Sequence, residues 1–304
     1  MLEADGIGRR FGGRTAVEEV RFHAEPGEVL GLLGPNGAGK TTTLRMLAGL
    51  LHPTSGRVLL DGRDLAAEGP QARRSLSYLP EQVAPYEEMT VTAYLRYLVR
   101  LRGIRGGEAR IAADDAMAEV GVDDVARRVI GTLSRGYRQR VAIAGAIAHQ
   151  PSVLLLDEPT SGLDPRQVVD VRRLITDLGR TRLVILSTHL LPEAAQLCDR
   201  VLVIHRGRQA ALAAPAELDT GGGRPVVVVA RAPADDLRAR LLAVPGVEEV
   251  TVEDQADGLV RAVVRAGDDR RAPLAAAVVG AGWELVELVR APADLEDAFL
   301  ALTS

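Results

Sequence analysis

The sequence of 304 residues has almost no lysine, one cysteine and no long apolar stretch. Of its 37 lysine and arginine residues, only Lys40 is a lysine. The single cysteine, Cys198, excludes an internal disulfide and is typical of a reducing compartment. No run approaches the roughly 18 to 20 apolar residues that span a bilayer, and the acidic first residues do not predict a signal peptide. The net charge of −4 does not favour a nucleic-acid partner.

The one lysine lies in a glycine-rich segment that fits G-x-x-x-x-G-K-[ST], the pattern of a phosphate-binding loop. An apolar run precedes it at 28–33 and apolar residues at helical spacing follow it, which predicts strand, loop and helix. A compact ammonium reaches between β- and γ-phosphates, where a planar guanidinium is too bulky. Glycines let backbone N–H groups turn toward phosphate, and the helix N-terminus adds partial positive charge. The predicted nucleotide-binding residues are Gly34, Pro35, Asn36, Gly37, Ala38, Gly39, Lys40, Thr41 and Thr42.

A second candidate segment lies far downstream, where the apolar run Val153–Leu156 ends in Asp157 and Glu158. A buried strand of this kind places its carboxylates at the sheet edge where open α/β folds bind ligands. We expect Asp157 and the hydroxyl of Thr41 to hold Mg²⁺, and Glu158 to polarise the attacking water as general base. The alternative, that the acids only cap the next turn, is plausible for one acid but less so for an Asp-Glu pair.

Five further segments make the chain resemble the ATP-binding-cassette (ABC) ATPases. Leu133–Arg140 is similar to the family's signature motif, and Ser161–Asp164 matches the loop that follows the catalytic glutamate. Ser187–His189 matches the switch-histidine segment. Phe11 lies where the family places an aromatic ring against adenine, and Tyr78–Gln82 lies where it has a glutamine loop. The order and spacing of all five segments agree with the family.

The resemblance covers roughly residues 2 to 215 and implies a P-loop (RecA-like) α/β core with a helical subdomain. It also implies that two cassettes bind two ATP molecules head to tail between them. Ser134 and Gly136 of one signature would then contact the γ-phosphate bound to the other cassette. By the same resemblance Asp164 belongs to the nucleotide site, and His189 is a catalytic residue that senses the γ-phosphate. ATP binding would close the dimer and hydrolysis would open it.

Two positions depart from the family pattern. Arg135 replaces the first glycine of the signature, which puts a Cβ and a cation beside backbone that is expected to approach phosphate. The glutamine loop is ambiguous, because alignment on Tyr78 places Glu81 at the expected position and Gln82 next to it. Either residue could contact Mg²⁺ or a water, and the sequence does not choose between them.

We therefore expect an ATP-binding and ATP-hydrolysing subunit that powers export through a separate multi-span membrane permease. It would lie in the cytoplasm, peripheral on the inner face of the cell membrane, and pair with a second copy of itself or a homologous cassette. Residues 85–140 are expected to form the helical subdomain, which by resemblance receives a cytoplasmic helix of the permease. Composition leaves open a different class, a non-transport ABC ATPase that remodels or regulates a soluble partner.

Gly221-Gly222-Gly223 separates the expected nucleotide-binding domain, 1–219, from an accessory domain, 220–304. In the accessory domain, residue periodicity predicts elements in the order βαββαβ, which suggests a ferredoxin-like α+β fold. The predicted strands are 225–231, 247–253, 259–265 and 283–290, and the predicted helices are 235–244 and 271–280. The tail Ala293–Leu300 resembles the end of drug-resistance and gliding-motility exporter ATPases of bacteria. We expect dimer or partner contacts there, the alternative being a stabilising appendage without a ligand.

Overall fold

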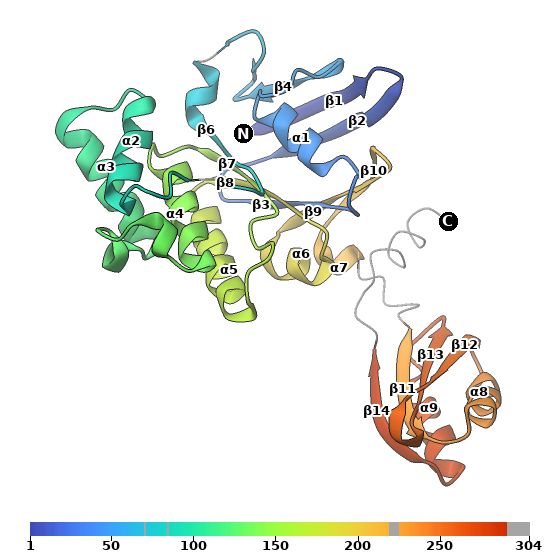
Figure 1. Cartoon of the computed structure of the whole chain (residues 1–304). Helices are drawn as coiled ribbons and strands as arrows, with labels where there is room; N and C mark the ends of the chain where they lie inside the picture. Colours follow the sequence, from blue (N-terminus) through green and yellow to red (C-terminus); the bar gives the residue numbers. More distant parts are fainter. Residues whose placement is uncertain (70, 84, 219–224, 291–304) are drawn as a thin grey trace. The chain divides into compact units, whose positions relative to one another are not determined.

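The computed structural model describes residues 1–69, 71–83, 85–218 and 225–290. The chain divides into two compact units, Met1–Pro215 and Ala216–Ser304, each described here by itself (Figure 1). Within the described residues, no helix is long and apolar enough to cross a bilayer.

The first unit is built on a sheet with the strand order β5-β4-β1-β2-β10-β9-β3-β8-β7-β6. One part is an antiparallel group of four strands: β1 (Leu2–Phe11), β2 (Arg14–Ala24), β4 (Ser55–Leu60) and β5 (Arg63–Asp64). The other part contains five parallel strands: β9 (Arg200–His205), β3 (Val29–Leu33), β8 (Leu183–Thr188), β7 (Val153–Asp157) and β6 (Leu76–Leu79). Strand β10 (Arg208–Ala213) runs antiparallel to β9 and joins the two parts.

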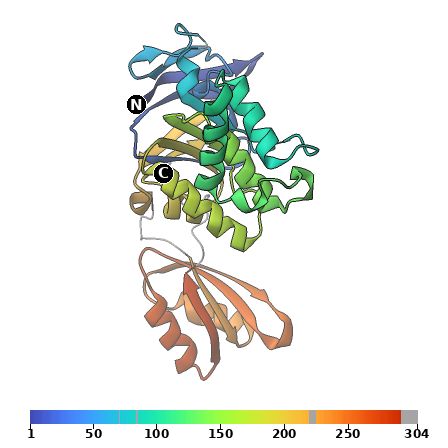
Figure 2. The same cartoon turned by 90° about the vertical axis from the view of Figure 1, so that its left-hand side faces the viewer.

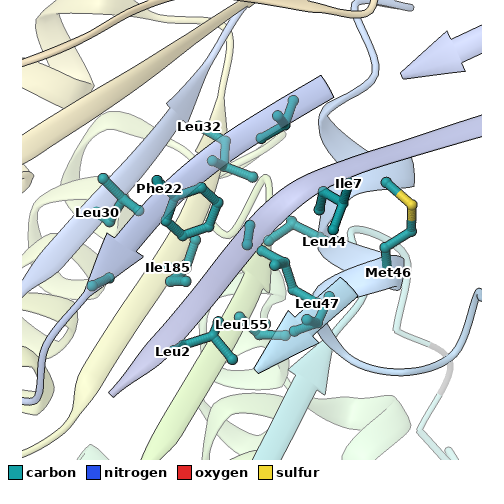
Figure 3. Close-up of a cluster of buried hydrophobic side chains, with 14 of the residues drawn as sticks. Leu2, Ile7, Phe22, Leu30, Leu32, Leu44, Met46, Leu47, Leu155 and Ile185 are labelled. Carbon is teal, nitrogen blue, oxygen red and sulfur yellow. The ribbon is translucent and has the colours of Figure 1, made fainter. Parts of the chain in front are cut away.

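The central parallel strands explain the apolar runs of the sequence. Every residue of β3, β7 and β8 is buried, because helices or the antiparallel group cover both faces of the sheet. Figure 3 shows part of this core, in which Phe22, Leu30, Leu44, Leu155 and Ile185 come from strands and a helix far apart in sequence. Since these strands run parallel, their carboxyl ends lie at one edge of the sheet.

Helices connect the strands, and the helices between residues 91 and 147 gather at one side of the unit (Figures 1 and 2). The α-helices are α1 (Lys40–Leu47), α2 (Val91–Leu101), α3 (Gly106–Val120), α4 (Arg135–Ile147), α5 (Pro165–Gly179) and α6 (Leu191–Leu197). The short helix α7 (Pro215–Leu218) begins at the last residue of this unit. Three short 3₁₀ turns are η1 (Ala72–Ser75), η2 (Asp123–Val125) and η3 (Ile130–Thr132). Helices α2, α3 and α4 pack on one another.

The second unit has the βαββαβ order that the sequence predicts. Its elements are β11 (Val226–Arg231), α8 (Ala234–Leu242), β12 (Val247–Asp254), β13 (Val260–Ala266), α9 (Arg271–Gly280) and β14 (Glu284–Arg290), with a 3₁₀ turn η4 (Ala256–Gly258) before β13. The four strands form an antiparallel sheet in the order β12-β13-β11-β14, which is the ferredoxin-like arrangement. Leu237 of α8 and Leu274 of α9 pack into its core. The tail prediction at 293–300 lies outside the described residues.

Candidate nucleotide-binding site

The loop between β3 and α1 requires its glycines for two different reasons. Gly37 and Gly39 have φ angles of +79° and +113°, where side chains cause strain. Gly34 has no room for a side chain, because a Cβ there would lie 2.2 Å from the carbonyl oxygen of Ile204. The loop leads directly into α1, whose first turn has no side-chain cap and no acid. Its terminal N–H groups are therefore suited to bind an anion.

Lys40 is buried, with 6% of its side chain exposed, and lies at the start of α1. Its ammonium donates to the carbonyl oxygens of Gly34, at 2.7 Å, and Pro35, at 3.3 Å. The same nitrogen lies 3.3 Å from Oε1 of Glu158. A buried cation needs such partners. The contacts bring the loop lysine and the acid at the end of β7 together, although 118 positions separate them in the sequence.

Asp157 is almost fully buried at the end of β7 and accepts hydrogen bonds from three hydroxyl groups. Thr41 Oγ1 and Ser187 Oγ donate to Oδ1, at 3.1 and 2.6 Å, and the Tyr78 hydroxyl donates to Oδ2 at 3.1 Å. Burial, with the nearby Asp157 carboxylate, raises the pKa of Tyr78, so its hydroxyl remains a donor. The Thr41 hydroxyl and the Asp157 carboxylate are hard oxygen donors side by side, the chemistry that Mg²⁺ prefers.

Glu158 has a strained backbone that three contacts hold in place. Its φ angle of +48° lies in the left-handed region, which costs a non-glycine residue on the order of 1 to 3 kcal/mol. Its N–H donates to Ser187 Oγ at 2.9 Å. Its carboxylate contacts Lys40, and Oε2 lies 2.8 Å from Nδ1 of His189. A carboxylate can only accept, so Nδ1 of His189 carries the proton in this contact.

A cavity of about 910 Å³ lies in front of these groups. Asn36, Gly37 and the residues from Gly39 to Thr42 line one side of it, and Glu158 and His189 line another. The remaining predicted loop residues, Gly34, Pro35 and Ala38, are not among the lining residues that the structure describes. Arg14 and Arg206, which the sequence did not indicate, add two cations to the wall. The cavity is therefore large, polar and supplied with positive charge, as a triphosphate requires.

Phe11 and Glu81 lie at the rim of this cavity. Phe11 lines it and is 48% exposed, with the Arg9 guanidinium 4.8 Å from the ring centre. This leaves ring surface available for a base. Glu81 also lines the cavity and accepts a hydrogen bond from Ser161 Oγ at 3.3 Å. Its neighbour Gln82 is exposed and is not among the lining residues that the structure describes.

Ser134, Gly136 and Asp164 lie elsewhere on the unit. Ser134 caps α4 and accepts from the N–H of Tyr137 at 3.3 Å. Asp164 caps α5 in the same way. A Cβ on Gly136 would lie 2.6 Å from the Gln167 side chain, so these two helix starts are closely packed. Among the described residues, none of the three predicted positions lines the cavity around Lys40.

Arg135 contacts the loop that follows Glu158. One of its terminal nitrogens donates to the carbonyl oxygen of Ser161 at 3.2 Å. A Cβ on Gly162 would lie 2.3 Å from the guanidinium. The arginine that replaces a family glycine thus lies flat on the Ser161–Asp164 loop of its own chain.

Comparison with known proteins defines the class of this site. Residues 17–161 match the family model described as ABC transporter. The chain is 40% identical over 229 residues to the daunorubicin/doxorubicin resistance ATP-binding protein DrrA of Streptomyces peucetius, covering 74% of this chain and 69% of that one. It is 33% identical over 304 residues to the Nod factor export ATP-binding protein I of Burkholderia thailandensis, covering 99% and 96%. The solved structure of cbiO1 from Clostridium perfringens, titled as part of the ABC transporter complex cbiONQ, has a TM-score of 0.64 at 29% identity and covers 71% of this chain and 89% of that one.

The chain therefore belongs to the ABC transporter family. It is an ATP-binding subunit with the α/β fold of ABC ATPases, and its ATP hydrolysis drives transport.

Proposed function

We propose that this subunit powers export through a separate multi-span permease, as a member of the drug-resistance type of bacterial exporter ATPases. The observation that carries the proposed chemistry is the meeting of Lys40, Glu158 and His189 at one cavity. Support for export comes from the relatives whose names describe drug resistance and Nod factor export. The accessory unit would contribute dimer or partner contacts.

Several residues at or beside the cavity have contacts that support a role in ATP hydrolysis. Lys40 and the loop N–H groups would bind the β- and γ-phosphates, while Phe11 would stack on adenine. Glu158 would accept a proton from the attacking water, and His189, 2.8 Å away, would hold the Glu158 carboxylate and contact the γ-phosphate. Thr41 and Asp157 would hold Mg²⁺, which when bound neutralises developing phosphate charge. Of the two glutamine-loop candidates we favour Glu81, because it lines the cavity.

The second cassette would complete the site. Ser134, Gly136 and Asp164 do not reach the cavity of their own chain among the described contacts, so we assign them to the nucleotide of a partner cassette. That partner would be a second copy or a homologue. The α4 N-terminus, with its N–H groups and Ser134, has the chemistry to bind a γ-phosphate in trans.

The permease would dock beside the helical subdomain, on the cytoplasmic side of the membrane. A smaller cavity, about 250 Å³, lies between the end of β6 and helices α2 and α4. Pro80, Leu98 and His149 are among its lining residues, and Tyr78 lies at its floor while also contacting Asp157. A permease segment bound in this cavity would therefore contact Tyr78, which in turn contacts Asp157, the proposed Mg²⁺ ligand.

The test uses the variant Glu158→Gln, which keeps the shape of the side chain and removes the base. We expect it to bind ATP, to hydrolyse it about 100-fold more slowly, and to accumulate as an ATP-dependent dimer. Turnover close to that of the unmodified chain would remove Glu158 from its role.

The same variant can identify the partner. It would be affinity-tagged, expressed in the native host and recovered from membranes in mild detergent. A stoichiometric multi-span protein in the complex supports the exporter. A soluble partner, with no membrane protein while ATP-dependent dimers still form, would favour the alternative of a non-transport ATPase.

A further inference from the structure

A buried carboxylate lies behind the catalytic groups, on the side away from the cavity. Glu193 of α6 has only 2% of its side chain exposed. Its Oε1 accepts a hydrogen bond from Thr160 Oγ1 at 2.5 Å, and its Oε2 accepts one from Thr188 Oγ1 at 2.6 Å. The guanidinium of Arg172 lies 3.5 Å from Oε1 and compensates part of the charge. Each carboxylate oxygen thus has its own threonine.

The two threonines belong to the two segments that carry the catalytic groups. Thr160 follows Glu158 by two residues, in a turn closed by a bond from the N–H of Ser161 to the carbonyl oxygen of Glu158 at 3.0 Å. Thr188 directly precedes His189, and its hydroxyl also accepts from the N–H of Leu190 at 3.1 Å. Glu193 therefore links the turn after the general base to the turn around the switch histidine.

Packing alone does not explain a charged residue at this position. Burying a carboxylate is costly unless its oxygens are hydrogen-bonded, and apolar replacement of buried ionic groups is often neutral for stability. What an apolar residue cannot supply is two directed acceptors, one toward each catalytic turn. The link has a consequence at the cavity, since Glu158 Oε2 and His189 Nδ1 are held 2.8 Å apart on the other side of the same turns.

We propose that Glu193 is a positioning residue for ATP hydrolysis, which sets the separation of Glu158 and His189 through Thr160 and Thr188. The proposal rests on the roles assigned to Glu158 and His189 above. Glu193 itself does not line the cavity in the part of the chain that the structure describes. It would therefore affect the rate of the chemical step while leaving the affinity for ATP nearly unchanged.

The central variant is Glu193→Gln, which keeps the size but replaces one acceptor oxygen with an NH₂ donor. One threonine then loses its acceptor. We expect kcat of the full chain to fall about 10- to 100-fold, the usual effect of a misplacement near 1 Å, with KM and the Kd for ATP changed less than about twofold. Gln196→Ala is the matched control on α6, because it removes the exposed bond from Arg172 at 2.7 Å and touches neither threonine.

A conservative pair tests whether the hydroxyl groups transmit the effect. Thr160→Val removes the donor and should lower kcat, whereas Thr160→Ser keeps a hydroxyl and should restore most of that loss. In the Thr160→Val background, Glu193→Gln should add little, because the link is already broken.

Three results would overturn the proposal. The first is an unchanged kcat in Glu193→Gln. The second is an equal loss of kcat in Thr160→Val and Thr160→Ser. The third is a parallel loss of kcat, ATP affinity and melting temperature in Glu193→Gln, which would make Glu193 a stabilising residue only. If instead the roles proposed for Glu158 and His189 are wrong, the result is different, because Glu158→Gln would then retain turnover whatever the effect of Glu193→Gln.

Discussion

Ser187 offers the most direct test of how the site is held together. Its side chain is fully buried, and its single hydroxyl both donates to Asp157 Oδ1 at 2.6 Å and accepts from the N–H of Glu158 at 2.9 Å. Ser187→Ala removes both bonds. A buried N–H without a partner costs about 1 to 3 kcal/mol, and a hydrogen bond to a charged group is worth about 1.5 to 3 kcal/mol.

We therefore expect the variant to lose about 2 to 5 kcal/mol of stability, after partial relaxation. At about 3 °C per kcal/mol for a unit of this size, the melting temperature should fall by roughly 6 to 15 °C. It should also lose ATPase activity, because the strained backbone of Glu158 loses the acceptor that holds its N–H.

Calorimetry is the suitable assay, since the only tryptophan, Trp283, belongs to the second unit and its fluorescence would report the wrong transition. The transition of the first unit is identified as the one that ATP shifts. The control Thr176→Ala removes an exposed bond to the Arg172 carbonyl oxygen and should stay within about 0.5 kcal/mol. A Ser187→Ala variant as stable and as active as this control would refute the reasoning.

Three further predictions concern other parts of the first unit. Lys40→Ala should abolish measurable ATP binding in titration calorimetry, and an unchanged Kd would contradict the role of the loop. Gly162→Ala should lower the melting temperature more when Arg135 is present than in an Arg135→Gly background, because the added Cβ would meet the guanidinium; equal losses would show that only the positive φ of Gly162 matters. Burial, with the nearby Arg102 cation, lowers the pKa of His149 to about 4, so the folded state binds a proton less readily than the unfolded state. Stability should therefore fall as pH drops from about 6.5 toward 4, and this fall should be smaller in His149→Gln by urea unfolding at several pH values.

The sequence predicts most of the fold because its signals are local. Residues within one short segment are enough to predict the glycine loop, and the same holds for the apolar run that ends in Asp157 and for each element of the βαββαβ order in the second unit. The structure places the corresponding strands and helices within a residue or two of the expected bounds at nearly every end. Gly37 and Gly39 are local signals of the same kind, because glycine in this motif predicts the positive φ angles that both residues have.

The contacts behind the site were not predictable in the same way. Tyr78 and Ser187 lie in motifs that the sequence shows, but their hydrogen bonds to Asp157 form only because β6 and β8 flank β7. No single segment of the sequence specifies which strands are neighbours in the sheet. Arg14 and Arg206 had no motif at all and reach the cavity only because β2 begins and β9 ends beside the loop. Nothing in the sequence distinguishes Glu193 from any other acid on a short helix, because its hydrogen bonds with Thr160 and Thr188 depend on the fold.

The strain at Glu158 connects these observations. A residue with φ of +48° relaxes unless its surroundings prevent it, and here the contacts that prevent it come from the end of β8 and from helices α1 and α6. Ser187 accepts a hydrogen bond from the N–H of Glu158, and Lys40 and His189 contact its carboxylate. Glu193 accepts hydrogen bonds from Thr160 and Thr188 in the two neighbouring turns. Because these groups share partners, the effects of substituting them should not add, and the loss of any one should release the same strained conformation. Glu158, the proposed base, is thus positioned by a set of neighbouring segments, and its geometry depends on the order of the strands as much as on its own motif.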